Sequence, residues 1–154
     1  MPTPLEKLAE IGYQLPQPRA AIGSYLPVAR TGNLLFISGQ LSADENGVTT
    51  GLLGDTMNIV QGQNAAELCA LNILAQIVHT AEVPLERIKR ILKLTVLVAS
   101  RPDFFEQPEV ANGASNLIVA VLGDKGRHAR AAFGVAALPW GAAVEIDAVV
   151  EVEG

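Results

Sequence analysis

The chain has 154 residues, of which 49% are hydrophobic and 18% charged, and its formal net charge is −5. This length fits one domain with a core of its own, and so few charged residues predict that further surface is buried in an oligomer. The negative charge counts against nucleic-acid binding, which needs a basic surface. We therefore expect one domain, residues 1–154, and no nucleic-acid partner.

The cysteine and histidine content restricts the chemistry further. Cys69 is the one cysteine, which excludes an internal disulfide and suits a reducing cytoplasm. The two histidines lie far from it in sequence and give no metal-ligand spacing, so we expect no metal and no cofactor. The start of the chain has no signal-peptide pattern, and no apolar run reaches the ~18 residues that cross a bilayer. The sequence therefore predicts a cytoplasmic protein without a membrane segment.

Residues 1–20 are expected to form a short helix and an extended tether ahead of the core at 21–154. Thr3 is a helix cap, Pro4 suits the first helical position, and Glu6 completes a capping box. Gly12 ends this helix. The prolines that follow keep the tether extended.

The core is predicted to alternate strands with two long helices. Strands are expected at 28–30, 34–37, 48–50 and 88–99, from runs of apolar and β-branched residues between turn signals. Helices are expected at 59–81 and 103–122, the second interrupted or started afresh at Pro108. This order predicts an α+β fold: a mixed sheet with two long helices on one face, plus a short N-terminal helix.

The last quarter of the chain is interpreted as two strands joined by a turn. From Val144 onward, apolar residues alternate with Glu145, Asp147 and other residues of the opposite face. The preceding strand is small and apolar and begins at Arg130, and residues 138–141 supply Pro and Gly for the turn. We expect the two strands to pair as a hairpin.

Five short runs carry a resemblance to a known family. In chain order they are Gly23-Ser24-Tyr25, Ser38-Gly39-Gln40, Asn112-Gly113-Ala114-Ser115, Gly126-Arg127-His128-Ala129-Arg130 and Gly141-Ala142-Ala143-Val144-Glu145. Their order and spacing resemble the RidA (YjgF) family of enamine/imine deaminases from about residue 21 to the C-terminus. The last two runs are similar to a longer-chain branch formerly labelled endoribonuclease L-PSP. The resemblance implies a chorismate-mutase-like fold and a homotrimer with sites in the clefts between subunits.

The resemblance also implies the site and its chemistry. The residues it implies are Arg130 and Glu145 as catalytic residues and Tyr25, Ser38, Gly39, Asn112 and Ala132 as substrate-binding residues. Arg130 would clamp the carboxylate of a small 2-imino or 2-enamino acid such as 2-aminoacrylate, because its planar fork can donate two parallel hydrogen bonds. Glu145 would position the attacking water and could also deprotonate it. Tyr25 and backbone amides near Gly39 and Ala132 would fix the imine nitrogen. The products would be a 2-keto acid and ammonia.

Two positions depart from the family pattern. Ser115 stands where the family has a tyrosine, and Ala132 stands where it typically has a cysteine. The smaller Ser115 is expected to change the pocket wall and hence the preferred side chain of the substrate, whereas Ala132 still offers its N–H. Two other functions stay open: a non-catalytic trimer that binds small carboxylates or scavenges other reactive metabolites, and a ribonuclease. Few aromatic residues for base stacking count against the ribonuclease.

The expected hairpin has a consequence for the site. Glu145 would lie opposite residues 133–135, and Arg130 would lie roughly 13 Å away at ~3.3 Å per residue. We therefore predict that each site combines Arg130 of one subunit with Glu145 of its neighbour. Closure within one chain stays open if a bulge or strong twist shortens the distance.

Overall fold

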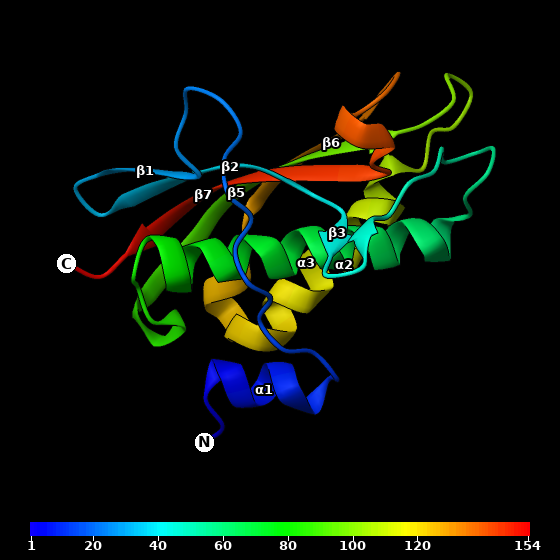
Figure 1. The fold of residues 1–154 in the computed structure, drawn as a ribbon. Coiled ribbons are helices and arrows are strands. Elements are labelled where there is room, and N and C mark those ends of the chain that lie inside the picture. Colours follow the sequence, from blue (N-terminus) through cyan, green and yellow to red (C-terminus); the bar gives the residue numbers. More distant parts are fainter.

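Five strands form a mixed sheet, and the helices lie on one side of it (Figure 1). The computed structural model describes residues 1–154. In spatial order the strands are β1 (Val28–Thr31), β2 (Leu34–Leu41), β7 (Val144–Val152), β5 (Ile88–Ala99) and β6 (Ala129–Val135). Only β5 and β6 run parallel to each other, and the other neighbours are antiparallel.

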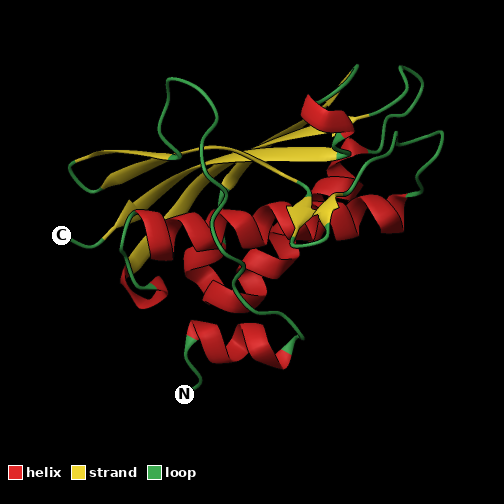
Figure 2. Cartoon of the chain, in the orientation of Figure 1, coloured by secondary structure: helices red, strands yellow, loops and turns green.

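The two long helices are α2 (Ile59–Ala75) and α3 (Gln107–Leu122), and α1 (Pro4–Glu10) is the short N-terminal helix. All three lie on the same side of the sheet (Figure 2). The predicted α+β arrangement is therefore confirmed. A smaller sheet of β3 (Ala43–Asp44) and β4 (Gly47–Val48) replaces the third strand expected at 48–50.

Helix starts follow from capping chemistry. Thr3 and Glu6 form the predicted capping box of α1, and Asn58 and Gln61 form a second one at the start of α2. A π-helical turn over Gln76–Thr80 continues α2, so the helix expected at 59–81 is confirmed apart from its final turn type.

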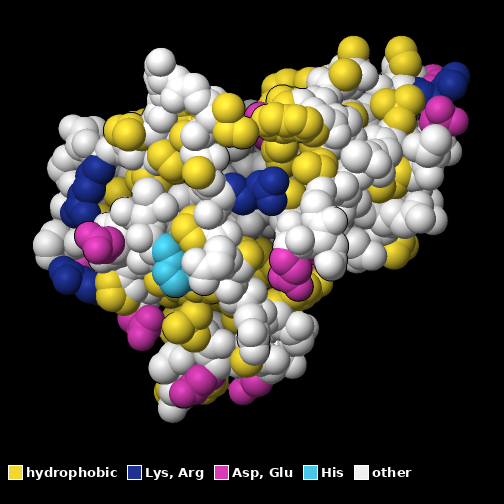
Figure 3. All heavy atoms as spheres, in the orientation of Figure 1, with side chains coloured by type: hydrophobic (Ala, Val, Ile, Leu, Met, Phe, Trp, Pro, Cys, Tyr) yellow, Lys and Arg dark blue, Asp and Glu magenta, His cyan; other side chains and the backbone are white.

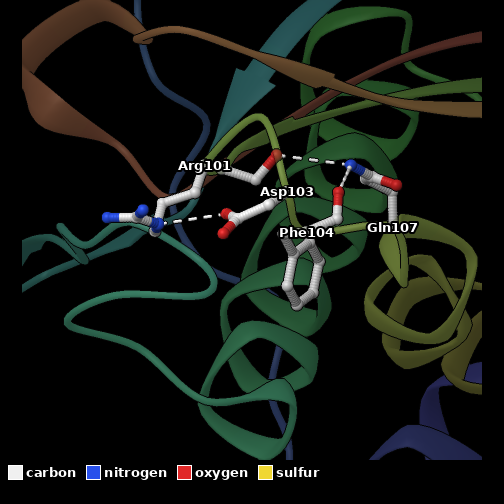
Figure 4. A network of polar contacts seen from close by, with 5 residues as sticks. Arg101, Asp103, Phe104 and Gln107 are labelled. Atoms are coloured by element: carbon white, nitrogen blue, oxygen red, sulfur yellow. Dashed lines mark hydrogen bonds and ion pairs between the residues drawn. The ribbon is translucent and has the colours of Figure 1, made fainter.

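The second long helix begins at Gln107, next to the predicted fresh start at Pro108, and the helical stretch expected from 103 is not formed. Pro108 has no N–H to donate and so belongs in the first helical turn. The segment before it is held as a loop, because Gln107 Nε2 donates to the carbonyl of Phe104 at 2.7 Å and Arg101 pairs with Asp103 at 3.1 Å (Figure 4).

The predicted hairpin between the last two strands is wrong. Strand β5 lies between them: Leu97 of β5 pairs with Phe133 of β6 on one side and with Glu145 of β7 on the other. The reason is topological, since β5, α3 and β6 form a crossover unit whose two strands run parallel and adjacent. The segment 136–143 then passes the end of β5 instead of making a tight turn.

The alternation predicted for β7 is confirmed and separates the two faces of the sheet. Val144, Ile146 and the other even-numbered residues to Val152 are buried under α2 and α3. Glu145 and the other odd-numbered residues face the opposite side, which no helix covers. Phe36 and Phe133 remain 45% and 47% exposed on this open face. In Figure 3, hydrophobic side chains gather along the part of the surface where Figure 1 places the sheet.

The N-terminal segment packs on the helices and then returns to the sheet. Leu8 of α1 is 1% exposed and belongs to the core cluster. Tyr13 donates a hydrogen bond to the carboxylate of Glu67 on α2, and this raises the pKa of Tyr13 to about 12. Figure 1 shows the chain running from α1 past the long helices toward β1. No helix is both long enough and apolar enough to cross a membrane.

Candidate functional site

Arg130 is fixed against α3 by one of its nitrogens. Its Nη1 donates to Oδ1 of Asn112 at 2.8 Å and to Oγ of Ser115 at 3.1 Å. These two residues lie three positions apart on one helical face, so both reach the same arginine. No carboxylate lies within 4.0 Å of Arg130, and its Nε and Nη2 make no hydrogen bond within the chain. The guanidinium is therefore oriented and still able to bind an anion.

His128 joins this cluster through Ser115. Its Nδ1 lies 2.6 Å from the carbonyl oxygen of Gly126, which can only accept, so we assign the proton to Nδ1. Its Nε2 lies 2.9 Å from Ser115 Oγ and accepts a hydrogen bond from this hydroxyl group. Burial lowers the pKa of His128, the hydrogen bond to Gly126 opposes this, and the charge of Arg130 lowers it further. A neutral imidazole thus holds the Ser115 hydroxyl in place.

Beside Arg130 is an open pocket of about 340 Å³, lined by Ser115, Val119, Arg127, His128 and Arg130. Sequence reasoning missed His128 and Arg127 as parts of this site. A signal was available, because residues two apart in an extended segment face the same side, which places His128 beside Arg130. The three basic residues fall within the four positions 127–130.

Glu145 lies on the open face of the sheet, above Gly39 of β2. A Cβ atom at position 39 would come within 2.8 Å of the Glu145 carboxyl carbon, so the carboxylate lies directly against the backbone of this glycine. Burial raises the pKa of Glu145, and the nearby charge of Asp147 raises it further. The carboxylate makes no hydrogen bond within the chain, which leaves it free to act on water.

Ser38 anchors the loop that carries Tyr25 next to Gly39. Its hydroxyl donates to the carbonyl of Leu26 at 2.7 Å, and its N–H donates to the carbonyl of Pro27 at 2.9 Å. Tyr25 itself is 54% exposed and makes no hydrogen bond within the chain. Gly39 thus lies against Glu145, and Ser38 ties the loop after Tyr25 to the strand residue next to Gly39. Asn112 and Ser115 instead contact Arg130.

One chain does not bring Arg130 and Glu145 together. Arg130 pairs with Leu94, on the face that the helices cover, while Glu145 pairs with Leu97, on the open face. Their positions differ by about 10 Å along the strands and about 10 Å across two strand spacings, or about 14 Å in all. Ala132 is two residues beyond Arg130 on β6 and shares its face. The premise of a hairpin was wrong, yet the wide separation of the two residues is found.

The residues offer no evident metal centre. No group of three or more His, Cys, Asp or Glu side chains lies close enough together to hold a metal ion. Cys69 is fully buried in α2, and burial raises the pKa of its thiol well above the ordinary value.

Comparison with known proteins places the chain in a family. Residues 6–151 match the family described as "YjgF/chorismate_mutase-like, putative endoribonuclease". Protein TCP17 of Trypanosoma cruzi is 48% identical over 146 residues, which cover 94% of this chain and 91% of that protein. The crystal structure of Atu1372 from Agrobacterium tumefaciens, a protein of unknown function, is 48% identical, with a TM-score of 0.92 over 99% of this chain and 94% of that one.

A third similar structure carries the name of the family that the sequence resembles. RidA from an Antarctic Psychrobacter is 30% identical, and the match covers 91% of this chain and 100% of that chain with a TM-score of 0.57. The resemblance found in the sequence and the chorismate-mutase-like fold it implied are therefore confirmed. The chain belongs to the YjgF/RidA-like family.

Proposed function

We propose that the protein hydrolyses small 2-imino and 2-enamino acids, such as 2-aminoacrylate, to 2-keto acids and ammonia. The observation that carries this proposal is that Arg130, in a chain of this family, has an oriented but partly unpaired guanidinium group. Asn112 and Ser115 hold one guanidinium nitrogen, and the other two have no partner within the chain. A bidentate donor that is oriented but unpaired suits a substrate carboxylate.

The reaction needs a base near the bound imine as well as a clamp. Water adds to the imine carbon and loses a proton to Glu145, which returns it to the nitrogen so that ammonia can leave. The overall change is imine plus water to ketone plus ammonia, with no oxidant or reductant. The raised pKa of Glu145 favours this exchange. A carboxyl group whose pKa lies nearer to neutral pH both accepts and donates a proton readily.

The site is proposed to form between subunits of a homotrimer. Arg130 and Glu145 point to opposite faces of one sheet, so a single chain cannot present both to one small molecule. The open face of the sheet, with Phe36 and Phe133 about half exposed, supports burial against a neighbouring copy. In this arrangement Arg130, Asn112 and Ala132 come from one subunit, and Glu145, Gly39, Ser38 and Tyr25 come from the next.

A second candidate is a trimer that binds small carboxylates without catalysis. It is favoured by one observation: the Arg130 pocket is complete within a single chain, whereas Glu145 is absent from it. The endoribonuclease activity in the family description finds less support, since the net charge of −5 counts against binding a polyanion.

A coupled assay tests the proposal. An enzyme that releases 2-aminoacrylate is run with and without this protein, and 2-keto acid formation is followed against the spontaneous rate. We expect a clear acceleration that Arg130→Lys abolishes. A rate equal to the spontaneous one, together with saturable pyruvate binding that Arg130→Lys removes, would favour the non-catalytic binder.

A further inference from the structure

We propose that the pocket beside Arg130 receives a second acidic group, so that the preferred ligand is a small acid with two carboxylates. This inference rests on the proposed function and specifies its substrate class: 2-imino acids with a short acidic side chain. Arg130 holds the carboxylate next to the imine carbon, and Arg127 faces the carboxylate of the side chain.

The first observation is unpaired positive charge. The only ion pairs within the chain are Lys89 with Glu151 and Arg101 with Asp103, so no carboxylate neutralises Arg127 or Arg130. The Arg127 side chain makes no hydrogen bond within the chain, although its backbone carbonyl accepts one from Arg90 Nη1 at 2.9 Å. A further guanidinium thus lies close by. Such a concentration of cations in a protein of net charge −5 favours an anion.

The second observation is how the pocket wall is ordered. Ser115 accepts a hydrogen bond from Arg130 and donates one to His128, so a single hydroxyl fixes both side chains. Both ring nitrogens of His128 are engaged, Nδ1 with the carbonyl of Gly126 and Nε2 with the hydroxyl of Ser115, so the neutral imidazole orders the wall and does not itself bind the anion. The pocket therefore holds an oriented arginine and a second arginine beside an ordered polar wall.

The third observation is the size and lining of the pocket. It measures about 340 Å³, and Val119 is its one apolar lining residue. A ligand with a long apolar side chain would shield both arginines from water without pairing them, and such desolvation of a charged group costs free energy. A two- or three-carbon chain ending in a carboxylate can pack on Val119 and reach the basic groups. The small side chain of Ser115 keeps this space open, because the tyrosine of the family pattern at this position would occupy part of the pocket.

The test compares two keto acids that differ only at the far end. 2-Oxoglutarate and 2-oxopentanoate both have five carbons, and the second carries a methyl group where the first has a carboxylate. Isothermal titration of the full-length protein is expected to give 2-oxoglutarate an advantage of about tenfold or more, equivalent to about 1.4 kcal/mol. Arg127→Gln should reduce this advantage below about threefold, while binding of 2-oxopentanoate stays within about twofold. Ser115→Tyr should reduce the advantage as well, because the tyrosine ring would occupy part of the pocket.

Arg30→Gln is the control, since it removes one exposed positive charge on β1 and should leave the advantage intact. Thermal unfolding checks that each variant is folded. Equal affinity for both keto acids, or an advantage that survives both pocket variants, would overturn the inference. In that case 2-oxopentanoate binding that still depends on Arg130 would leave the proposed function standing. Failure of both keto acids to bind would overturn the inference and the proposed function together.

Discussion

Arg130 and Glu145 have opposite surroundings, and their environments assign them different tasks. Arg130 is anchored by two side chains of α3 and keeps donors free for an anion. Glu145 makes no hydrogen bond and lies in a partly buried position that disfavours its charged form. The first arrangement suits tight positioning of a substrate, and the second suits proton transfer.

Replacing Arg130 by lysine tests the clamp. A lysine keeps the charge but loses the planar fork, so two parallel hydrogen bonds to a carboxylate become impossible. We expect Arg130→Lys to lower kcat/KM for 2-aminoacrylate by at least about a hundredfold while the fold, followed by circular dichroism, is retained. Activity within about twofold of the unmodified protein would remove Arg130 from this role.

Replacing Glu145 by glutamine tests the base. Because Gln has nearly the same shape, we expect turnover to fall by about a hundredfold or more while keto-acid binding changes little. Rate against pH gives a second readout: a base must be deprotonated, so the rate falls as pH drops through the raised pKa of Glu145. Glu145→Gln should abolish this acid-side decrease. A loss confined to ligand affinity would instead make Glu145 a binding residue.

At the scale of elements, the contact between α2 and α3 positions the Arg130 site, because α3 carries both Asn112 and Ser115. Gly113 lies between these two and faces the backbone of α2. A Cβ atom there would come within 2.8 Å of the Cα atom of Gln63. The helices can approach this closely only because residue 113 has no side chain.

We therefore expect Gly113→Ala to push the helices apart and lower the free energy of unfolding by about 1–3 kcal/mol, despite the better helix propensity of alanine. Urea denaturation measures the change. Asn116→Ala, an exposed substitution on the same helix, is the matched control and should change stability by no more than about 0.5 kcal/mol. A stabilised Gly113→Ala variant would show that the helices adjust without cost.

The individual helices and strands were more predictable from the sequence than the order of the strands in the sheet. Capping residues and apolar periodicity predicted α1, α2 and the two faces of β7, because these signals are local in sequence. The hairpin between β6 and β7 was wrong because the strand order depends on β5, which ends 30 positions before β6 begins. Pro108 predicted a fresh start for α3, whereas the loop over 103–106 was not predicted, because the side-chain contacts of Gln107 with that loop leave no pattern in the sequence.

The candidate site likewise contains residues that the sequence indicated and others, His128 among them, that it did not. The resemblance implied Asn112, Arg130, Gly39 and Glu145 as site residues but did not say which of them are neighbours. The structure places Asn112 against Arg130 and Gly39 against Glu145, and the roles of all four stay predictions. His128 was missed because its importance comes from Ser115, a residue 13 positions away that reaches it across the space between α3 and β6. The two-residue spacing places His128 beside Arg130, but no periodicity in the sequence predicts its contact with Ser115.

For the whole molecule, the uncovered face of the sheet predicts an assembly. Phe36, Phe133 and Leu97 would leave apolar surface in water if the chain stayed alone. We expect light scattering at micromolar concentration to give three times the chain mass of 16.2 kDa, and dissociation only under denaturing conditions. A mass of one chain would contradict the assembly and the shared site with it.

A subunit-mixing experiment tests whether Arg130 of one subunit works with Glu145 of another. Arg130→Ala and Glu145→Ala are each expected to be inactive. Refolding them together in equal amounts should form mixed trimers in which one of the three sites regains both intact residues.

With random assembly and independent sites, the mixture should recover about a quarter of the activity of the unmodified protein. Mass spectrometry confirms that mixed trimers have formed, and a mixture of Arg130→Ala with Arg130→Lys serves as the control that cannot recover. Recovered deaminase activity near this level is the result we predict. Mixed trimers as inactive as their parents would contradict a site shared between subunits.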